Sequence, residues 1–280
     1  MIRKQLGIVM NKRVNRIKVH HETRYEYETD LSYAIQRIYL TPRQLKGVRI
    51  TSWNIKSNFD CFSQIDSLGN ELHLLVMSKP TKTLNIEITG LVDIYKGRTR
   101  FGERQSSQDK KKEMLHYLFK KFTDLTMPNK EIYEMALGTF KAKDQVNSLL
   151  LIAEAIEERI EYTKGATGVK TTAVESWEQK AGVCQDHAHV MLSAVRAIGI
   201  PARYVSGYLQ GESDASQATH AWVEVWLGKW IGIDVTNKKL VDEKFLSLAI
   251  GTDYLSMAPI RGVRQGGGNE HMYVKVSVSE

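Results

Sequence analysis

The spacing of apolar residues changes once along this chain, and that change limits the folds available to it. From about residue 16 to residue 96, apolar side chains recur at every second position, as in the run Leu84, Ile86 and Ile88. A period of two is typical of half-buried strands. From Met114 onward, apolar residues recur at three- and four-residue intervals, which is typical of amphipathic helices. The sequence therefore predicts a strand-rich first part and a mixed second part.

A polar stretch separates the two patterns. Residues 98–112 show neither period, so they form the expected linker. The sequence predicts a β-rich N-terminal domain at 1–97, a linker at 98–112 and an α+β domain at 113–280. Several short strands with turns between them, such as the hairpin turn Asp66–Asn70, favour an antiparallel β-sandwich for the first domain. A chain of 280 residues can bury cores of this size without disulfides or metals.

Start and stop signals mark two helices in the second part. Thr172 and Glu175 have the spacing of a capping box, which predicts the start of a short helix. A second helix is expected from Cys184 until the stop signals Gly199 and Pro201. Alternating runs after it predict strands at 202–209, 220–227, 230–235 and 273–278.

The chain is basic, with a net charge of +7, which permits an anionic partner. The basic residues are dispersed, however, and the densest run, Lys110–Lys112, leads into an apolar-periodic stretch typical of a helix. Aromatic residues interleaved with a basic patch, which are common in nucleic-acid-binding proteins, do not accompany this run. Nucleic acid is therefore not an expected partner; salt-sensitive retention on heparin would indicate an anion-binding function instead.

Cysteine content and hydropathy limit the classes of protein to which the chain can belong. Cys61 and Cys184 fall in different predicted domains, so no disulfide framework is expected. No run of about 18 apolar residues occurs, so no membrane span is expected. The apolar patch within Met1 to Arg16 is too short for a secretory signal, and the cytoplasm is the expected location. The sequence does not indicate an oligomeric state.

Cys184 has the sequence setting of a reactive thiol. It stands at the predicted start of a helix, directly after a turn that contains Gly182. The unpaired N–H groups and the dipole of a helix N-terminus favour an anion, which lowers the pKa of a thiol there. The alternative for such a residue is a buried, inert cysteine. Cys61 lacks this setting and is expected to be structural.

His220 and Asp234 lie on two predicted strands joined by a hairpin, and its register decides whether they meet. A two-residue loop would pair Val223 with Asp234, which would turn the carboxylate away from His220. A three-residue loop, Leu227–Lys229, pairs Trp226 with Trp230 and places both side chains on one face, at roughly 7–8 Å between backbones. A Cys184–His220–Asp234 triad therefore requires the three-residue loop.

The roles in such a triad follow from its chemistry. Cys184 attacks a carbonyl carbon, His220 acts as base and acid, and Asp234 fixes the tautomer of the imidazole. The backbone N–H of Cys184 supplies one donor to the oxyanion. The second donor is open, with Trp177 and Gln179, just upstream, as candidates.

Other polar and aromatic residues near these segments have competing interpretations. Asp186, His187 and His189 could suggest a metal site beside Cys184, but zinc-helix spacings are not met. Packing or hydrogen bonding around the helix is the expected role of both histidines, and neither a metal nor a cofactor is expected. The tryptophans of the hairpin could line a groove, but at strand spacing core positions are favoured; they are Trp222, Trp226 and Trp230.

Several ordered segments resemble a known family. The segments 182–189, 199–208, 220–225 and 234–237 resemble the core of the transglutaminase-like superfamily, and more narrowly bacterial transglutaminase-like cysteine proteases. The stretch 21–27 with 41–43 is similar to the β-rich N-terminal region found with that core in bacteria, and 261–263 with 266–268 to the closing segment of that group. The resemblance spans roughly residues 17 to 280.

This resemblance implies a papain-like α+β catalytic core at 113–280. The Cys, His and Asp positions of the family map onto Cys184, His220 and Asp234 without departure. Two neighbouring positions differ: His187 stands where relatives often carry an aromatic residue, and Val235 where they often carry proline. Neither difference removes a catalytic group, although His187 could alter the pocket.

The sequence therefore predicts a cysteine-dependent acyl-transfer enzyme that attacks peptide or amide carbonyls through a thioester. Water as the second substrate gives a protease or amidase, which the bacterial resemblance favours; an amine gives a protein-glutamine transglutaminase. A peptide or protein is the expected substrate, and the polar loop Gln210 to Ala218 is expected to gate the groove. A noncatalytic peptide-binding scaffold is the alternative from another class.

Overall fold

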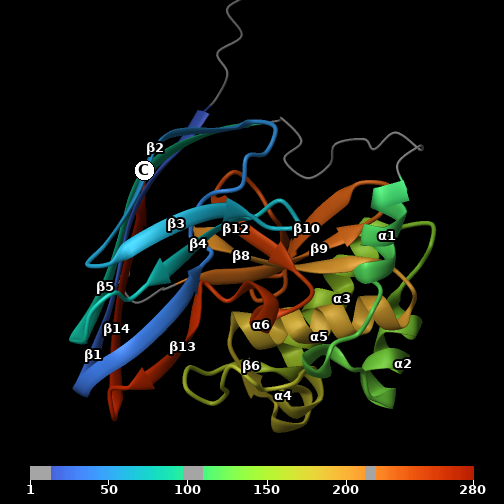
Figure 1. Ribbon diagram of the computed structural model, residues 1–280. Helices are drawn as coiled ribbons and strands as arrows, with labels where there is room; N and C mark the ends of the chain where they lie inside the picture. The colour runs from blue at the N-terminus through green and yellow to red at the C-terminus, as the bar shows by residue number, and fades with distance from the viewer. Residues whose placement is uncertain (1–13, 97–109, 212–218) are drawn as a thin grey trace, which may run out of the picture.

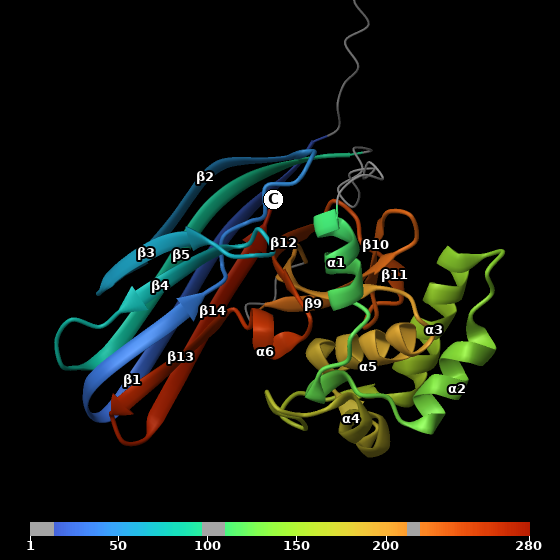
Figure 2. The ribbon, with the colours of Figure 1, turned by 45° about the vertical axis from the view of Figure 1, so that its right-hand side comes forward.

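The computed structural model describes residues 14–96, 110–211 and 219–280. Figures 1 and 2 show two parts side by side, a curled sheet and a second sheet covered by helices. The predicted α+β class, with a β-rich N-terminal region followed by an α+β core, is confirmed.

The N-terminal sheet is antiparallel and has seven strands. They are β1 (Val14–Ile38), β2 (Val48–Ser57), β3 (Asp60–Ile65), β4 (Glu71–Val76), β5 (Thr81–Tyr95), β13 (Ile260–Gly266) and β14 (Glu270–Ser279). The long strand β1 pairs with β5 and β14 along its first half and with β4 and β13 along its second half. Its register breaks between Glu26 and Leu31. Ile17 and Ile38, from the two halves, belong to one buried cluster, so the sheet curls around a common core (Figure 2).

The last two strands of this sheet come from the C-terminal end of the chain. The sequence assigns 113–280 to the catalytic core, whereas residues 260–279 pair with β1. Alternation of side chains identifies a strand but carries no information on which sheet it joins. The N-terminal sheet is therefore closed by strands more than 200 residues away in the chain.

The expected linker is only partly described. Residues 97–109 lie outside the described ranges, and helix α1 (Lys110–Leu118) begins within the last residues of the predicted linker. His116 on this helix stacks on Trp226, at 4.4 Å between ring centroids, and so attaches α1 to the core.

The core contains a five-stranded antiparallel sheet with the order β11-β10-β9-β8-β12. Its strands are β8 (Ala202–Leu209), β9 (His220–Trp226), β10 (Trp230–Asp234), β11 (Lys239–Leu240) and β12 (Phe245–Gly251). A small parallel pair is formed by β6 (Glu161–Tyr162) and β7 (Ala181–Gly182). The helices are α2 (Lys130–Thr139), α3 (Gln145–Arg159), α4 (Ala173–Gln179), α5 (Cys184–Ala197), α6 (Tyr254–Met257) and the 3₁₀ turn Asp124–Thr126.

Helix α5 is central to the core because it is buried on every side. All its residues from Asp186 to Arg196 are buried, and it contacts β8 and β9 on one side and α2, α3 and α4 on the other. A helix that is buried all round must be enclosed by other elements. Helices α2, α3 and α4 accordingly gather around α5 on one face of the five-stranded sheet (Figure 1).

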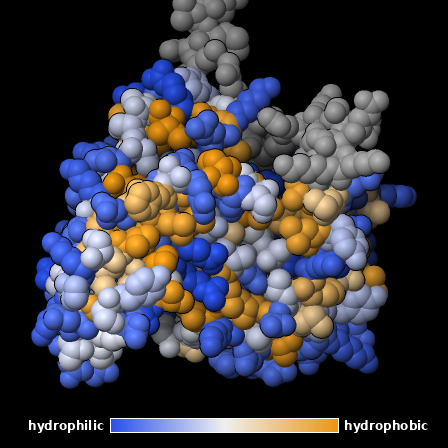
Figure 3. Space-filling model, in the orientation of Figure 1, coloured by the Kyte–Doolittle hydropathy of each residue, from blue (hydrophilic) through white to orange (hydrophobic). Residues whose placement is uncertain are grey.

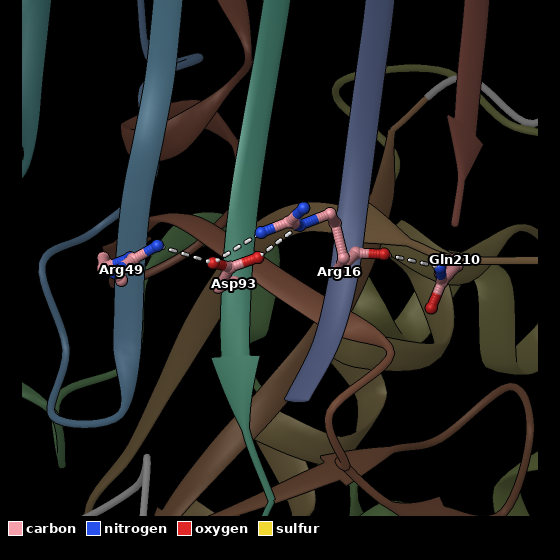
Figure 4. Close-up of polar contacts among 4 residues, drawn as sticks. All are labelled: Arg16, Arg49, Asp93 and Gln210. Carbon is pink, nitrogen blue, oxygen red and sulfur yellow. Dashed lines mark hydrogen bonds and ion pairs between the residues drawn. The ribbon is translucent and has the colours of Figure 1, made fainter. Parts of the chain in front are cut away.

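The two parts of the molecule share buried side chains and polar contacts. Tyr208 on β8 lies in the same apolar cluster as the inner residues of the N-terminal sheet. Asp93 on β5 pairs with Arg16 on β1 at 2.7 Å and with Arg49 on β2 at 3.1 Å. Gln210, directly after β8, donates a hydrogen bond to the carbonyl oxygen of Arg16 at 3.3 Å (Figure 4). This network connects three strands of the sheet to the end of β8.

Hydrophobic and hydrophilic residues are mixed on the surface. Figure 3 shows hydrophobic and hydrophilic residues interspersed across one face, over both the sheet and the helical part. In the described ranges no helix combines the length and the apolar character needed to cross a membrane.

Candidate active site

The hairpin of β9 and β10 has the three-residue register that a triad requires. Trp226 pairs with Trp230 across the loop Leu227–Lys229, and the N–H of Leu227 donates to the carbonyl oxygen of Lys229 at 2.9 Å. Gly228 has a φ of 76°, a left-handed conformation that glycine adopts without strain. His220 and Asp234 therefore share a face, and Nε2 of His220 lies 3.0 Å from Oδ2 of Asp234.

Local structure places Cys184 at the first position of α5. The capping box of Thr172 and Glu175 starts α4, as predicted, and the left-handed residue Lys180 ends it. Asp186 accepts hydrogen bonds from the N–H of Val183 at 2.7 Å and from the hydroxyl of Thr167 at 2.6 Å. These contacts fix the turn that leads into Cys184.

Gly182 is required by the same turn. A Cβ at this position would lie 2.6 Å from the Cβ of Asp186. Only glycine allows the carboxylate to close over the turn at this distance.

Cys184 and His220 line one cavity of about 510 Å³. Its other described lining residues come from six segments of the core: Tyr162, Lys164, Val183, Gln185, Tyr204, Ser206, Leu209, Thr219, Ala221, Thr236, Asn237, Tyr254 and Pro259. Residues 212–218 of the loop that the sequence predicts to gate the groove lie outside the described ranges. A concave site with a thiol, an imidazole and a few polar groups is the usual setting of acyl-transfer chemistry.

The surroundings of His220 favour its protonated form. Burial lowers the pKa of its imidazole, but hydrogen bonds and charge interactions with Asp234 and Cys184 outweigh burial and raise the pKa to about 10. Since Nε2 is held by Asp234, Nδ1 is the ring nitrogen left for the thiol. An imidazolium beside a cysteine stabilises the thiolate as an ion pair.

The surroundings of Asp234 favour its ionised carboxylate form. Burial raises its pKa, but the hydrogen bond and the charge of His220, together with two hydrogen bonds from Asn237, lower the pKa below its ordinary value. The side-chain amide of Asn237 donates to Oδ2 at 2.6 Å and its backbone N–H to Oδ1 at 3.3 Å. Sequence reasoning missed Asn237, although a polar residue three positions after the acid was a readable signal.

Three tyrosines of the cavity were also missed as functional residues. Tyr162, Tyr204 and Tyr254 each have a pKa raised by burial first and then by the charge of Cys184. Their phenols therefore stay protonated beside a thiolate and can donate hydrogen bonds. Tyr204 is 2% exposed and packs edge to face on Tyr254, at 6.3 Å between ring centroids.

The two suggested oxyanion donors do not reach the cavity. The indole N–H of Trp177 donates to Glu131 at 2.9 Å, and Gln179 lies exposed at the end of α4. Neither belongs to the cavity lining. The lining residues whose side chains carry neutral donors are instead Gln185, Asn237, the three tyrosines and the hydroxyl residues Ser206, Thr219 and Thr236.

The histidines near Cys184 are turned to backbone groups. Nδ1 and Nε2 of His187 lie 2.9 Å and 3.1 Å from the carbonyl oxygens of Val183 and Ile160. Nε2 of His189 accepts the backbone N–H of Tyr254 at 3.1 Å. Both side chains thus hydrogen-bond around α5, as expected.

Two of the three hairpin tryptophans are core residues, as predicted, whereas Trp226 is half-buried. Trp222 is 1% exposed and Trp230 is 6% exposed. Trp230 packs edge to face on Trp226, at 5.3 Å between ring centroids, and under the guanidinium of Arg203, at 4.0 Å. None of the three tryptophans lines the cavity among the described residues.

Two family models match different parts of the chain. Residues 135–235 match the transglutaminase-like superfamily, and residues 17–93 match the bacterial transglutaminase-like N-terminal region. The chain therefore contains a transglutaminase-like core and a bacterial transglutaminase-like N-terminal region. The family expected from the ordered sequence blocks is confirmed, and the superfamily match contains Cys184, His220 and Asp234.

Relatives of this transglutaminase-like chain occur in bacteria. An uncharacterized protein of Mycobacterium leprae is 28% identical over 94% of this chain and 98% of its own length. An uncharacterized protein of Mycobacterium tuberculosis is 29% identical over 94% and 92%. A protein-glutamine gamma-glutamyltransferase of Pseudomonas aeruginosa is 33% identical over 36% of this chain and 17% of that protein.

A solved structure shares the whole transglutaminase-like architecture. The crystal structure of a candidate cysteine protease from Cytophaga hutchinsonii matches 95% of this chain and 91% of its own, with a TM-score of 0.74 and 22% identity. At that identity the likeness establishes the fold, including the association of the curled sheet with the core.

Proposed function

We propose that this protein is a cysteine-dependent acyl-transfer enzyme that cleaves peptide or amide bonds through a thioester on Cys184. The observation that carries the proposal is the 3.0 Å contact of His220 with the buried carboxylate of Asp234, since His220 lines the same cavity as Cys184. Each group has the partner that its role in a triad demands.

The proposed reaction has two halves. The thiolate of Cys184 attacks the carbonyl carbon, and the C–N bond breaks as the imidazolium of His220 gives its proton to the leaving amine. Water then attacks the thioester while His220 accepts a proton from it, and the C–S bond breaks to release the acid and the thiol. Asp234 keeps the ring oriented in both halves, and the first N–H of α5, on Cys184, faces the developing oxyanion.

Water is the proposed acceptor because of the charge at the cavity. Lys164 is a basic side chain at its lining, and no Asp or Glu occurs among the described lining residues. A second cation, such as the ammonium group of a lysine substrate, gains no electrostatic attraction there. The alternative acceptor, an amine, is favoured by the partial match to a protein-glutamine gamma-glutamyltransferase.

A reducing compartment suits this chemistry. Cys61 and Cys184 are both free thiols, and the proposed nucleophile must remain reduced to react. The cytoplasm, which keeps thiols reduced, is therefore the proposed location.

Incubation with a peptide library, with and without a primary amine, separates the possible functions. Wild type, Cys184→Ala and the matched control Cys61→Ala would be compared by mass spectrometry. We expect cleavage products with wild type and Cys61→Ala but not with Cys184→Ala. Mass shifts equal to amine addition would indicate a transglutaminase instead. Identical spectra for all three proteins, with peptide retained on the protein, would indicate a noncatalytic scaffold.

A further inference from the structure

One wall of the Cys184 cavity is a short segment, residues 250–259, that lies between the core and the N-terminal sheet. Tyr254 and Pro259 of this segment line the cavity. Its only helix is α6, which is four residues long and begins at the cap Asp253, whose carboxylate accepts the N–H of Ser256 at 2.8 Å. The first two residues of the segment end β12 and pair with β8, but the rest has so little secondary structure that its position depends on other contacts.

Asn70, in the turn between β3 and β4 of the N-terminal sheet, holds the start of this wall. Its side chain is fully buried, and its amide donates to the carbonyl oxygen of Ile250 at 2.9 Å while its carbonyl oxygen accepts the N–H of Ile250 at 2.9 Å. The side chain thus forms with Ile250 the pair of bonds that a neighbouring strand would form. The same amide lies 3.4 Å from the sulfur of Met257, the last residue of α6.

Hydrogen bonds within the N-terminal sheet fix the conformation of the turn that carries Asn70. Oδ1 of Asp66 accepts the N–H groups of Leu68 and Asn70, each at 2.9 Å, and Oδ2 accepts the side-chain amide of Asn70 at 2.9 Å. The hydroxyl of Tyr39 donates to the same carboxylate at 3.3 Å. Asn70 is therefore presented to Ile250 in a fixed orientation.

The N-terminal sheet holds the wall at two further points. Arg261 on β13, a strand of that sheet, donates to the carbonyl oxygen of Leu255 within α6 at 2.7 Å. The backbone N–H of Tyr39 donates to the carbonyl oxygen of Pro259 at 2.8 Å. The start, the middle and the end of the wall are thus each bonded to the sheet.

The core contributes contacts to the same segment. Arg196 donates to the carbonyl oxygen of Thr252 at 2.7 Å, and His189 accepts the N–H of Tyr254 at 3.1 Å. The ring of Tyr254 packs against Tyr204 over the cavity. The sheet and the core therefore both bond to the segment that contains Tyr254, whose side chain lines the cavity with Cys184.

We propose that the N-terminal sheet positions the substrate-binding wall of the cavity, with Asn70 and Arg261 as the positioning residues and Tyr254 as the residue through which they act. This inference rests on the proposed acyl-transfer function of the cavity. The sheet is then part of the active site, because a shift of the wall by about 1 Å is enough to impair substrate positioning.

Two variants of the full chain remove the two side-chain contacts. Asn70→Ala leaves the N–H and C=O of Ile250 without their partner, and Arg261→Met removes a bond made by an exposed side chain, so it is expected to fold even if Asn70→Ala does not. The matched controls lie in the same sheet, away from the wall: Asn58→Ala, which loses a bond to the carbonyl oxygen of Thr83, and Arg24→Met, which loses an ion pair with Glu26.

The readouts are amide hydrogen exchange at residues 252–258 and steady-state release of p-nitrophenolate from p-nitrophenyl acetate, corrected with Cys184→Ala. We expect faster exchange at the wall and a rise in KM of about tenfold with little change in kcat for both variants, because the lost interaction serves binding. Neither control should change either readout. In a Tyr254→Ala background, Asn70→Ala and Arg261→Met should add no further rise in KM.

Two results would overturn the inference. One is unchanged exchange at 252–258 in every folded variant. The other is a rise in KM that persists in full when Tyr254 is already alanine. Absence of Cys184-dependent release from wild type would instead count against the acyl-transfer function, and the exchange measurement would still decide whether the sheet positions the wall.

Discussion

Nε2 of His220 lies 3.0 Å from Oδ2 of Asp234, although the two residues stand on different strands. They face each other because the hairpin loop between β9 and β10 has three residues and pairs Trp226 with Trp230. Asn237 donates to the same carboxylate oxygen at 2.6 Å. The carboxylate therefore has a fixed position from which it can orient the imidazole toward Cys184.

Substitution of Asp234 by Asn is expected to abolish most activity without unfolding the protein. An amide of the same size can keep the contact with His220 but favours the wrong ring tautomer and cannot stabilise an imidazolium. We expect kcat for Cys184-dependent hydrolysis to fall by about 10³- to 10⁴-fold. Steady-state kinetics beside a circular dichroism spectrum would measure this.

The matched control for that variant is Asp242→Asn, which changes an acidic residue outside the cavity. It should leave kcat unchanged. An Asp234→Asn protein that retains a third or more of the wild-type kcat would show that His220 needs no charged partner.

The two cysteines are expected to differ in their reaction with iodoacetamide. The pKa of His220 is raised to about 10, so its imidazolium persists at neutral pH and favours the thiolate of Cys184. Burial raises the pKa of the Cys61 thiol, which makes it less reactive. At pH 7 we expect selective alkylation of Cys184, read by peptide mass spectrometry.

His220→Ala should remove that selectivity. Without the imidazolium, alkylation of Cys184 should become appreciable only near the pH of an ordinary thiol, about 8.5. Equal alkylation of both cysteines at pH 7 in wild type would contradict the ion pair.

Much of the core and its site could be predicted from the sequence because the signals are local. The capping box at Thr172, the start of α5 at Cys184 and the stop at Gly199 depend on neighbouring residues alone, and the structure places all three as predicted. The hairpin register stayed open at the level of the sequence, because Gly228 belongs to both the two-residue and the three-residue loop, and the structure has the three-residue loop. Local backbone chemistry decides each of these features.

Features that depend on contacts between distant segments were not predictable. The alternation of apolar residues in 273–278 indicated a strand. It does not indicate with which strand this segment pairs, and the structure pairs it with β1. The cavity wall around Tyr254 is held by Asn70, about 180 residues earlier, and a turn sequence does not show what it contacts. Trp177 and Gln179 were proposed as oxyanion donors from proximity in sequence, whereas α4 directs them away from the cavity.

Gly182→Ala is expected to disturb the site through the turn that precedes α5. The added Cβ would lie 2.6 Å from the Cβ of Asp186, so the start of the helix must shift. We expect a loss of about 1–3 kcal/mol in the free energy of unfolding, measured with urea, and slower alkylation of Cys184 at pH 7. Gly138→Ala is the control, since a Cβ there meets nothing within 4 Å. Equal stability of the two variants would show that the turn accommodates the methyl group.

His21 is expected to make the association of sheet and core sensitive to acid. It is 2% exposed on β1, with Nδ1 2.6 Å from the hydroxyl of Tyr208 on β8 and Nε2 2.8 Å from the hydroxyl of Thr23. Burial, with a smaller effect from the charge of His20, lowers the pKa of His21 from its ordinary value of 6.5 to about 4. The folded protein therefore keeps this ring neutral in a pH range where the unfolded chain protonates it.

The sign of the pH effect follows from that difference. Because the unfolded chain binds more protons between pH 6.5 and about 4, the stabilising contribution is complete above pH 6.5 and is lost as the pH falls toward 4. Between pH 7 and pH 4.5, His21 alone should lower the free energy of unfolding by about 2–3 kcal/mol.

Urea unfolding of wild type and His21→Gln at both pH values would isolate the contribution of His21, since other buried groups titrate alike in both proteins. The variant should be less stable at pH 7 but lose less stability on acidification, whereas substitution of the exposed His271 by Gln should change neither value. If wild type and His21→Gln lost the same free energy of unfolding between pH 7 and pH 4.5, the contact between His21 and Tyr208 would persist when the ring is protonated.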